Sequence, residues 1–215
     1  MLKSLNIMSE VWFRSRKREF FYRKAKKEQF RARSAYKLID LQNKFNLIRR
    51  GDVVIDLGAA PGSWSQVALE LVGPKGRVIA VDISPIMSLS GPFEAILGDI
   101  CKESTIAKVK QTLQDKLADV VLCDAAPKFS GIKSLDIGIA LQIANCALNF
   151  ATQVLKKHGA FVTKAFQGPD YAEFVQKLQK HFKLVKEVKP PASLRTSSEV
   201  YLVCLNYIKT EAKQE

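Results

Sequence analysis

A short run of small residues follows the first strongly apolar, β-branched segment of the chain. The segment "DVVIDL" leads into "GAAPG" at residues 58–62, and an amphipathic pattern begins directly afterwards. Small side chains allow the backbone to approach a ligand closely, and the predicted helix presents its amino terminus to the same place. The run lacks the middle glycine of the dinucleotide fingerprint G-x-G-x-x-G, so it gives only a weak indication of a pyrophosphate.

Two aspartates follow the next two predicted strands. Asp82 ends the second predicted strand, and Asp99 comes directly after the third, in "AILGDI". Ligands of open α/β sheets bind beyond the carboxyl ends of the strands, so we expect both carboxylates at one site. Asp82 is placed to accept hydrogen bonds from ribose hydroxyls, and Asp99 to accept one from an adenine amino group. The two aspartates thus indicate a nucleoside, whereas the loop gives only a weak indication of a pyrophosphate. This combination favours S-adenosylmethionine as the cofactor over NAD.

Strand and helix patterns alternate along most of the chain. Apolar β-branched runs predict strands at residues 52–57, 77–82, 93–97, 118–124, 159–165, 182–188 and 199–207. Amphipathic patterns predict helices at residues 31–46, 63–72, 103–115, 136–157 and 170–180. This alternation predicts an α/β fold with a mainly parallel sheet and helices on both faces. Only "PPASLRTSS" separates the last two strands, so we expect them to pair antiparallel at one side of the sheet.

The positive charge of the chain is concentrated near its amino terminus. The first 50 of the 215 residues hold 15 Lys and Arg against 4 Asp and Glu, which gives +11 of the total formal charge of +13. The segment "FRSRKREFFYRKAKKEQFRARSAYKL" also carries aromatic residues among its cations. Basic side chains neutralise phosphates, and exposed aromatic rings stack on unpaired bases. The segment therefore predicts contact with nucleic acid.

The rest of the composition predicts one domain without a metal site or a membrane span. The four cysteines show no CxxC spacing and are Cys101, Cys123, Cys146 and Cys204. We expect buried thiols in a reducing cytoplasm rather than metal ligands. No uninterrupted apolar run approaches the roughly 18 residues that a membrane span needs, and the amino terminus becomes basic before any secretory-type apolar core develops. A cytoplasmic location is therefore expected. We also expect a monomer.

Several segments resemble the FtsJ family of RNA ribose 2′-O-methyltransferases, from about Arg23 to Tyr207. They are "RARSAYKL", "DLGAAPGSWSQVA", "GRVIAVDI", "GDI", "LCDAAP", "FVTKAFQG" and "SSEVYLV". Ser63 departs from the glycine that is usual in bacterial members, and "FYRKAKKEQFRARSAYKL" resembles archaeal and eukaryotic members. The resemblance implies a Rossmann-like, S-adenosylmethionine-dependent methyltransferase with a seven-stranded, mostly parallel sheet and one antiparallel strand. Together with the distribution of charge, it divides the chain into an expected RNA-contacting arm at residues 1–30, a methyltransferase domain at residues 31–208 and a flexible tail at residues 209–215.

The resemblance also implies the residues of the site. The Lys-Asp-Lys-Glu tetrad of the family falls on Lys37, Asp124, Lys164 and Glu199. The implied cofactor-binding residues are Asp56, Gly58, Pro61, Gly62, Trp64, Asp82, Asp99 and Asp124. No metal ligand is expected among them.

Methyl transfer to a ribose hydroxyl accounts for the residue types of the tetrad. A hydroxyl is a poor nucleophile, whereas a sulfonium methyl is an activated electrophile, so the protein must align the two and remove a proton. A neighbouring cation and burial favour the neutral form of a lysine. We therefore expect Lys164 to be the base, with Lys37 beside it. Asp124 would orient that amine, and Glu199 would position a lysine or the hydroxyl.

Other activities and substrates were weighed against this hypothesis. The missing glycine and the basic segment disfavour a nicotinamide-dependent oxidoreductase, and the intact tetrad disfavours a non-catalytic RNA-binding or ribosome-assembly protein. The segments "KAFQG" and "SSEVYLV" resemble members that act on a uridine of large-subunit ribosomal RNA. The basic segment and the Gly-Ser-Trp of the cofactor loop resemble members that act on the tRNA anticodon loop. We favour ribosomal RNA, because the core motifs lie nearer the chemistry.

Truncation of residues 1–30 tests the expected division between arm and domain. RNA affinity should fall and should depend less on salt, while the affinity for S-adenosylmethionine changes little. Each phosphate contact contributes a slope of roughly −0.7 to −0.9 in log affinity against log salt concentration. Binding titrations of RNA at several salt concentrations measure this slope, and an unchanged slope would remove the arm from the RNA site.

Overall fold

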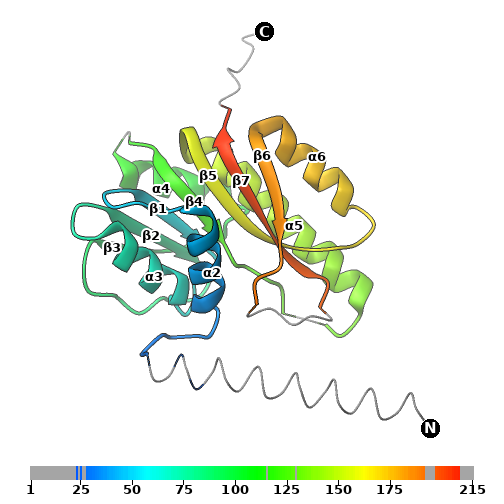
Figure 1. The fold of residues 1–215 in the computed structure, drawn as a ribbon, viewed down its shortest axis with the longest axis horizontal. Helices are drawn as coiled ribbons and strands as arrows, with labels where there is room; N and C mark the ends of the chain where they lie inside the picture. Colours follow the sequence, from blue (N-terminus) through cyan, green and yellow to red (C-terminus); the bar gives the residue numbers. More distant parts are fainter. Residues whose placement is uncertain are drawn as a thin grey trace.

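The computed structural model describes residues 23, 25, 28–114, 116–128, 130–191 and 197–208. Most of the expected RNA-contacting arm and the expected tail at residues 209–215 lie outside the described residues. The described chain forms one seven-stranded sheet in the order β3-β2-β1-β4-β5-β7-β6 (Figure 1). The strands are β1 (Val53–Leu57), β2 (Arg77–Asp82), β3 (Phe93–Leu97), β4 (Ala118–Cys123), β5 (Leu155–Phe166), β6 (Phe182–Val188) and β7 (Glu199–Tyr207).

One strand of this sheet runs against all the others. β7 lies between β5 and β6 and pairs antiparallel with both, whereas the pairs among β1 to β5 are all parallel. This confirms the predicted mostly parallel sheet with one antiparallel strand. It also confirms that the last two strands of the chain pair antiparallel at one side of the sheet.

Helices cover both faces of the sheet, as predicted. α2 (Ala35–Phe45) and α3 (Ser63–Val72) pack on one face (Figure 1). The other face is covered by α4 (Glu103–Leu113), α5 (Lys133–Val154) and α6 (Tyr171–His181). Successive strand residues point to opposite faces, so Val54 packs toward α2 and α3, whereas Ile55 and Leu57 pack toward α4, α5 and α6. By length and composition α5 could cross a membrane, and here it contributes to the core over β4 and β5.

Two predicted boundaries differ from the structure in ways that matter for the site. The helix predicted from residue 31 begins only at Ala35, because residues 31–34 form bends and turns. The helix predicted at residues 136–157 occupies Lys133–Val154, so β5 begins earlier than expected. β5 continues through an irregularity between Leu155, paired with Ala118, and Ala160, paired with Val120. The polar "KKHG" between them lacks the apolar pattern that marks a strand.

The expectation of four buried thiols was wrong for two of the cysteines. Cys101 lies just before α4, Cys146 lies within α5, and the two form a disulfide across a Cα–Cα distance of 4.9 Å. They are separated by 45 positions, and only the packing of α4 beside α5 brings them together. Cys123 and Cys204 are free and buried, as expected. Burial raises the pKa of the Cys123 thiol to about 11, which makes it unreactive.

Candidate active site

The carboxyl ends of β1 and β4 lie side by side at the centre of the sheet. After β1 the chain turns to α3 on one face, and after β4 it continues to α5 on the other. Such a change of direction opens a crevice at the carboxyl edge, where ligands of open α/β sheets bind. A Cβ at Gly58 would lie 2.4 Å from the Cβ of Ala125. The loops after β1 and β4 can therefore approach each other only with glycine at position 58.

Lys164 and Asp124 form the first half of the predicted tetrad. Lys164 lies on β5, and its Nζ donates hydrogen bonds to the backbone oxygen of Asp124 at 2.5 Å and to its Oδ1 at 3.0 Å. The Lys164 side chain is only 8% exposed. Burial opposes ionisation of Asp124, but the charges of Lys164 and Lys37 and a hydrogen bond from Tyr201 hold its pKa below the usual value. Asp124 is therefore an anion beside a buried amine.

Lys37 and Glu199 form the second half of the tetrad. Lys37 projects from α2, and its Nζ lies 2.7 Å from Glu199 Oε1 at the start of β7. The same Nζ donates to the hydroxyl of Tyr201 at 3.0 Å. Tyr201 in turn donates to Asp124 Oδ1 at 2.5 Å. The structure thus brings all four tetrad residues into one hydrogen-bonded network, with Tyr201 joining its two ion pairs.

Tyr201 is a residue that sequence reasoning missed as part of the site. It lies opposite Lys164 in the β5–β7 register and is completely buried. Burial, together with the charges of Asp124 and Glu199, raises the pKa of Tyr201 well above its ordinary value. The phenol therefore stays protonated and can donate to Asp124. Its spacing from Glu199 places both side chains on one face of a strand, and this is the sequence signal that could have identified it.

Asp82 and Asp99 lie beside each other beyond β2 and β3. The amide of Gly98 donates to the backbone oxygen of Asp82 at 2.9 Å, which links the ends of the two strands. Asp82 Oδ2 accepts the amide of Ala60 at 2.9 Å, so its carboxylate also supports the loop after β1. Asp99 Oδ1 accepts the amide of Cys101 at 2.9 Å. Both aspartates are half-buried and face the same edge as the tetrad.

Asp56 is the most deeply buried carboxyl of this edge. It is 1% exposed and lies on β1, where its Oδ2 accepts the hydroxyl of Ser65 at 2.6 Å. Its Oδ1 is buried and has no hydrogen-bond partner among the described residues. Burial raises the pKa of Asp56 to about 7; the hydrogen bond from Ser65 opposes this shift, and the charges of Asp124 and Asp82 add to it. One oxygen of Asp56 is thus an unused acceptor.

The remaining predicted cofactor residues take different positions. Pro61 and Gly62 lie in the loop after β1, and Gly62 adopts a φ of +102°, which favours glycine. The Trp64 side chain instead packs inward between α2, α3 and the sheet. It is 2% exposed, its Nε1 donates to the backbone oxygen of Ser34 at 2.9 Å, and its ring lies 5.7 Å from that of Tyr201. Trp64 therefore supports the network from the core side.

The chemistry of this edge fits S-adenosylmethionine. Four carboxyl groups belong to the ends of β1 to β4 or the residues after them, and they are Asp56, Asp82, Asp99 and Asp124. S-adenosylmethionine carries a sulfonium and an ammonium, which carboxylates attract, whereas the pyrophosphate of NAD is an anion that they would repel. The unpaired oxygen of Asp56 is a further buried polar group at this edge that such a ligand would satisfy.

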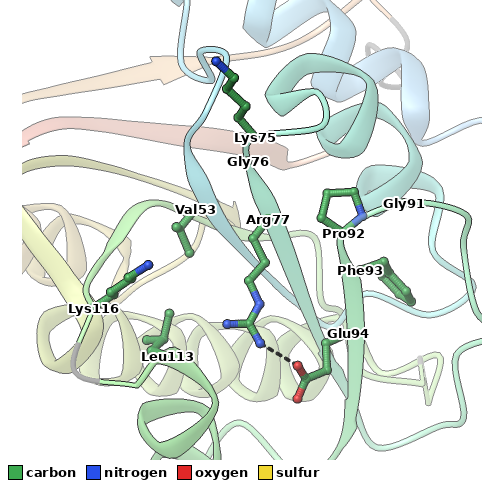
Figure 2. Close-up of a pocket in the computed structure, with 10 residues that line it drawn as sticks. All are labelled: Val53, Lys75, Gly76, Arg77, Gly91, Pro92, Phe93, Glu94, Leu113 and Lys116. Atoms are coloured by element: carbon green, nitrogen blue, oxygen red, sulfur yellow. Dashed lines mark hydrogen bonds and ion pairs between the residues drawn. The ribbon is translucent and has the colours of Figure 1, made fainter.

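A depression of about 400 Å³ lies elsewhere, at the amino ends of the strands (Figure 2). Val53, Arg77 and Phe93 line it from the starts of β1, β2 and β3. Figure 2 shows the Arg77 guanidinium turned toward Glu94, and their charged atoms lie 2.6 Å apart. None of the tetrad residues lines this depression. Charge and hydrogen bonding, rather than hollow volume, therefore locate the candidate active site.

Comparisons with known proteins identify the family of the chain. A family model for FtsJ-like methyltransferases matches residues 30–207. A ribosomal RNA large subunit methyltransferase E of Methanothermobacter thermautotrophicus is 44% identical over 197 residues, which cover 91% of this chain and 93% of the relative. The protein of the same name from Methanobrevibacter smithii is 42% identical over 201 residues, which cover 93% and 95%.

Solved structures share the fold. A Plasmodium falciparum protein, provisionally described as a ribosomal RNA methyltransferase, aligns with a TM-score of 0.74 and 31% identity over 83% of this chain and 98% of its own. Fibrillarin of Aeropyrum pernix, solved with bound S-adenosylmethionine, aligns with a TM-score of 0.56 and 16% identity over 80% and 76%. At that identity the second likeness shows the fold alone.

The fold and its carboxyl-edge site define an S-adenosylmethionine-dependent methyltransferase that acts on RNA. The chain belongs to the FtsJ-like methyltransferase family, over nearly all of the described domain. The family inferred from the sequence motifs is thereby confirmed. The roles of the individual site residues stay predictions.

Asp56→Asn should alter how stability depends on pH. A carboxyl whose pKa is about 7 in the folded protein and near 3.9 in the unfolded chain keeps its proton only in the folded state between these values. Its contribution to stability is therefore complete below about pH 4 and is lost as the pH rises to 7. Between pH 5 and pH 8 the free energy of unfolding should fall by roughly 2 kcal/mol more in the unmodified protein than in Asp56→Asn.

Urea unfolding at each pH measures this difference. Ser65→Ala removes the hydrogen bond that lowers the Asp56 pKa, so it should move the transition to higher pH. Parallel pH profiles for all three proteins would contradict the assignment of a protonated Asp56.

Proposed function

We propose that the chain methylates a ribose 2′-hydroxyl of large-subunit ribosomal RNA, at a uridine. The observation that carries this proposal is the largely buried network in which Tyr201 joins the Lys164–Asp124 and Lys37–Glu199 pairs at the carboxyl edge of the sheet. The names of the relatives from Methanothermobacter and Methanobrevibacter support ribosomal RNA as the substrate. The residues named in the tetrad would be the catalytic ones.

RNA would reach this site with the help of the basic arm at residues 1–30. The concentration of charge within the first 50 residues supports this role, since an RNA backbone offers the matching negative charge. The domain at residues 31–208 would carry out the chemistry as a monomer in the cytoplasm.

Lys164 would act as the general base. S-adenosylmethionine supplies an activated methyl group when it is bound at the carboxyl edge. A neutral amine has two N–H groups, and the two oxygens of Asp124 at 2.5 and 3.0 Å from Lys164 Nζ can accept both. The lone pair of the amine would then be left to take the proton of the 2′-hydroxyl, whose oxygen would gain the methyl group as the carbon–sulfur bond of the sulfonium breaks to leave a neutral thioether.

Lys37, Glu199 and Tyr201 would act by fixing Asp124. Glu199 offsets the charge of Lys37 at 2.7 Å, and Lys37 donates to the Tyr201 oxygen. That contact directs the Tyr201 proton toward Asp124 Oδ1. With its carboxylate held in this way, Asp124 keeps the Lys164 amine in one orientation.

Lys164→Arg tests the base. Arginine keeps the positive charge and much of the reach but does not lose its proton at any accessible pH. The variant should bind S-adenosylmethionine and RNA nearly as the unmodified protein does, and single-turnover methylation should fall by at least ~100-fold, the usual worth of a general base. The rate in the unmodified protein should rise with pH, because only the neutral amine accepts a proton.

Lys37→Arg is the matched control, since the proposal needs only a cation at that position. It should retain more activity than Lys164→Arg. Robust turnover by Lys164→Arg with a shallow pH profile would instead make Lys164 a permanent cation that steers the hydroxyl, and would end the general-base proposal.

The substrate is tested by mapping 2′-O-methyl groups in total RNA from cells that lack the gene. Loss of one methyl group in large-subunit ribosomal RNA, restored by the unmodified protein and not by Lys164→Ala, is the expected result. Loss in the tRNA anticodon loop would replace ribosomal RNA with the alternative substrate. Restoration by Lys164→Ala would indicate a non-catalytic role in ribosome assembly.

A further inference from the structure

Arg31 joins the loops that follow the paired strands β1 and β2. Its guanidinium donates to the backbone oxygen of Pro61 at 3.0 Å, in the loop after β1. It also donates to the backbone oxygens of Met87 at 2.7 Å and Ser88 at 2.8 Å, in the loop between β2 and β3. Pro61 belongs to the predicted cofactor loop, and residues 83–92 directly follow the predicted ribose-binding Asp82.

The backbone around Arg31 is fixed to the same region. The Arg31 amide donates to Gln66 Oε1 at 2.8 Å, and Gln66 Nε2 donates to the backbone oxygen of Gln29 at 3.2 Å. The hydroxyls of Ser34 and Ser63 lie 2.7 Å apart. Residues 29–34 thus run as a strap along the loop after β1 and the first turns of α3. These contacts explain why α2 begins at Ala35 and not at residue 31, as the sequence pattern predicted.

The loop between β2 and β3 exposes much of its apolar surface. Within it, Ile83 and Met87 are 74% and 75% exposed. The glycine at position 62 leaves room for Arg31, because a Cβ there would lie 2.7 Å from Arg31 Nη1 and 3.4 Å from Ile86 Cγ2. Gly62 therefore permits the close approach of both the guanidinium and the loop.

We propose that Arg31 is a positioning residue of the cofactor pocket, which holds the loop at residues 83–92 against the loop at residues 58–62. Although its position continues the basic sequence of the arm, Arg31 serves cofactor binding rather than RNA binding. The proposal rests on the proposed placement of the cofactor beside Asp82 and Pro61. All three acceptors of its guanidinium are backbone oxygens, so the contact depends on the arginine and not on the side chains of the loops.

The planar guanidinium is the group that this arrangement needs. Arginine presents five N–H donors in a rigid fork and can serve acceptors in two loops at once. Lysine carries the same charge as a single ammonium on a flexible stem, and it cannot hold three separated oxygens with comparable geometry. The effect of a substitution at Arg31 on cofactor affinity should therefore depend on loss of the guanidinium donors and not on loss of the positive charge.

The test compares Arg31→Ala, Arg31→Lys and Arg49→Ala. Arg49 is an exposed arginine at the opposite edge of the sheet, so Arg49→Ala controls for the change of charge. Calorimetric titration with S-adenosylmethionine should show affinity about tenfold or more lower in both Arg31 variants, as expected for lost charge-assisted hydrogen bonds, and within about twofold of normal in Arg49→Ala. Hydrogen exchange should be faster at residues 83–92 in the Arg31 variants alone.

Steady-state kinetics and RNA binding add readouts that a general loss of stability would not produce. The KM for S-adenosylmethionine should rise in Arg31→Ala while kcat changes little, and the salt dependence of RNA affinity should match that of Arg49→Ala. Normal cofactor affinity with unchanged exchange, or a salt slope lower than that of the control, would overturn the proposal and make Arg31 an RNA contact.

Asp82→Ala separates this proposal from the placement of the cofactor. If Asp82→Ala loses cofactor affinity and Arg31→Ala does not, only the role of Arg31 is refuted. If neither variant loses cofactor affinity, the placement of the cofactor at this edge is refuted with it. Loss of affinity in both, with faster exchange at residues 83–92 in Arg31→Ala, supports the positioning role.

Discussion

The hydrogen-bonded network at the carboxyl edge of the sheet depends on one largely buried carboxylate. Asp124 Oδ1 accepts hydrogen bonds from both Lys164 and Tyr201, in surroundings where an unpaired charge would be costly. Because Tyr201 must donate to Asp124, its oxygen is left to accept from Lys37. Lys37 then meets a neutral oxygen on one side, and Glu199 supplies the charge that it needs on the other. Each member of the network is thus explained by the one before it.

The topology of the sheet makes this network possible. The antiparallel β7 is inserted beside β5, and its register places Tyr201 opposite Lys164 and Glu199 opposite Phe166. Glu199 and Tyr201 are two positions apart, so both face the side of the sheet that α2 and α3 cover. α2 brings Lys37 to that side, and the end of β4 brings Asp124. A parallel β7 would begin at the opposite edge and would carry its first residues away from Asp124.

Much of this could be predicted from the sequence, and the exceptions share a cause. Alternating apolar runs identified the strands, and motif resemblance placed Lys37, Asp124, Lys164 and Glu199, because local pattern and local motif carry that information. Tyr201, Arg31 and the Cys101–Cys146 disulfide were missed. Tyr201 and the disulfide depend on which elements become neighbours in space, and the contacts of Arg31 depend on the path of two irregular loops. From the sequence alone, a tyrosine in a strand and an arginine in a basic segment give no indication of a particular role. Their roles become visible only when their neighbours in the fold are known.

A cationic cofactor and an anionic RNA need protein surfaces of opposite charge. The chain places these two kinds of charge in different regions. Carboxylates gather at the ends of β1 to β4, where they suit a cationic cofactor, whereas most of the net positive charge lies within the first 50 residues. An RNA backbone drawn directly to the acidic edge would be repelled by the groups that attract the cofactor. Residues 29–34 lie at the border between these regions, and their hydrogen bonds run to the cofactor side. Neutral groups of the RNA, such as a ribose hydroxyl, can approach this edge at lower electrostatic cost than phosphates, and a ribose hydroxyl is the group on which the proposed base Lys164 would act.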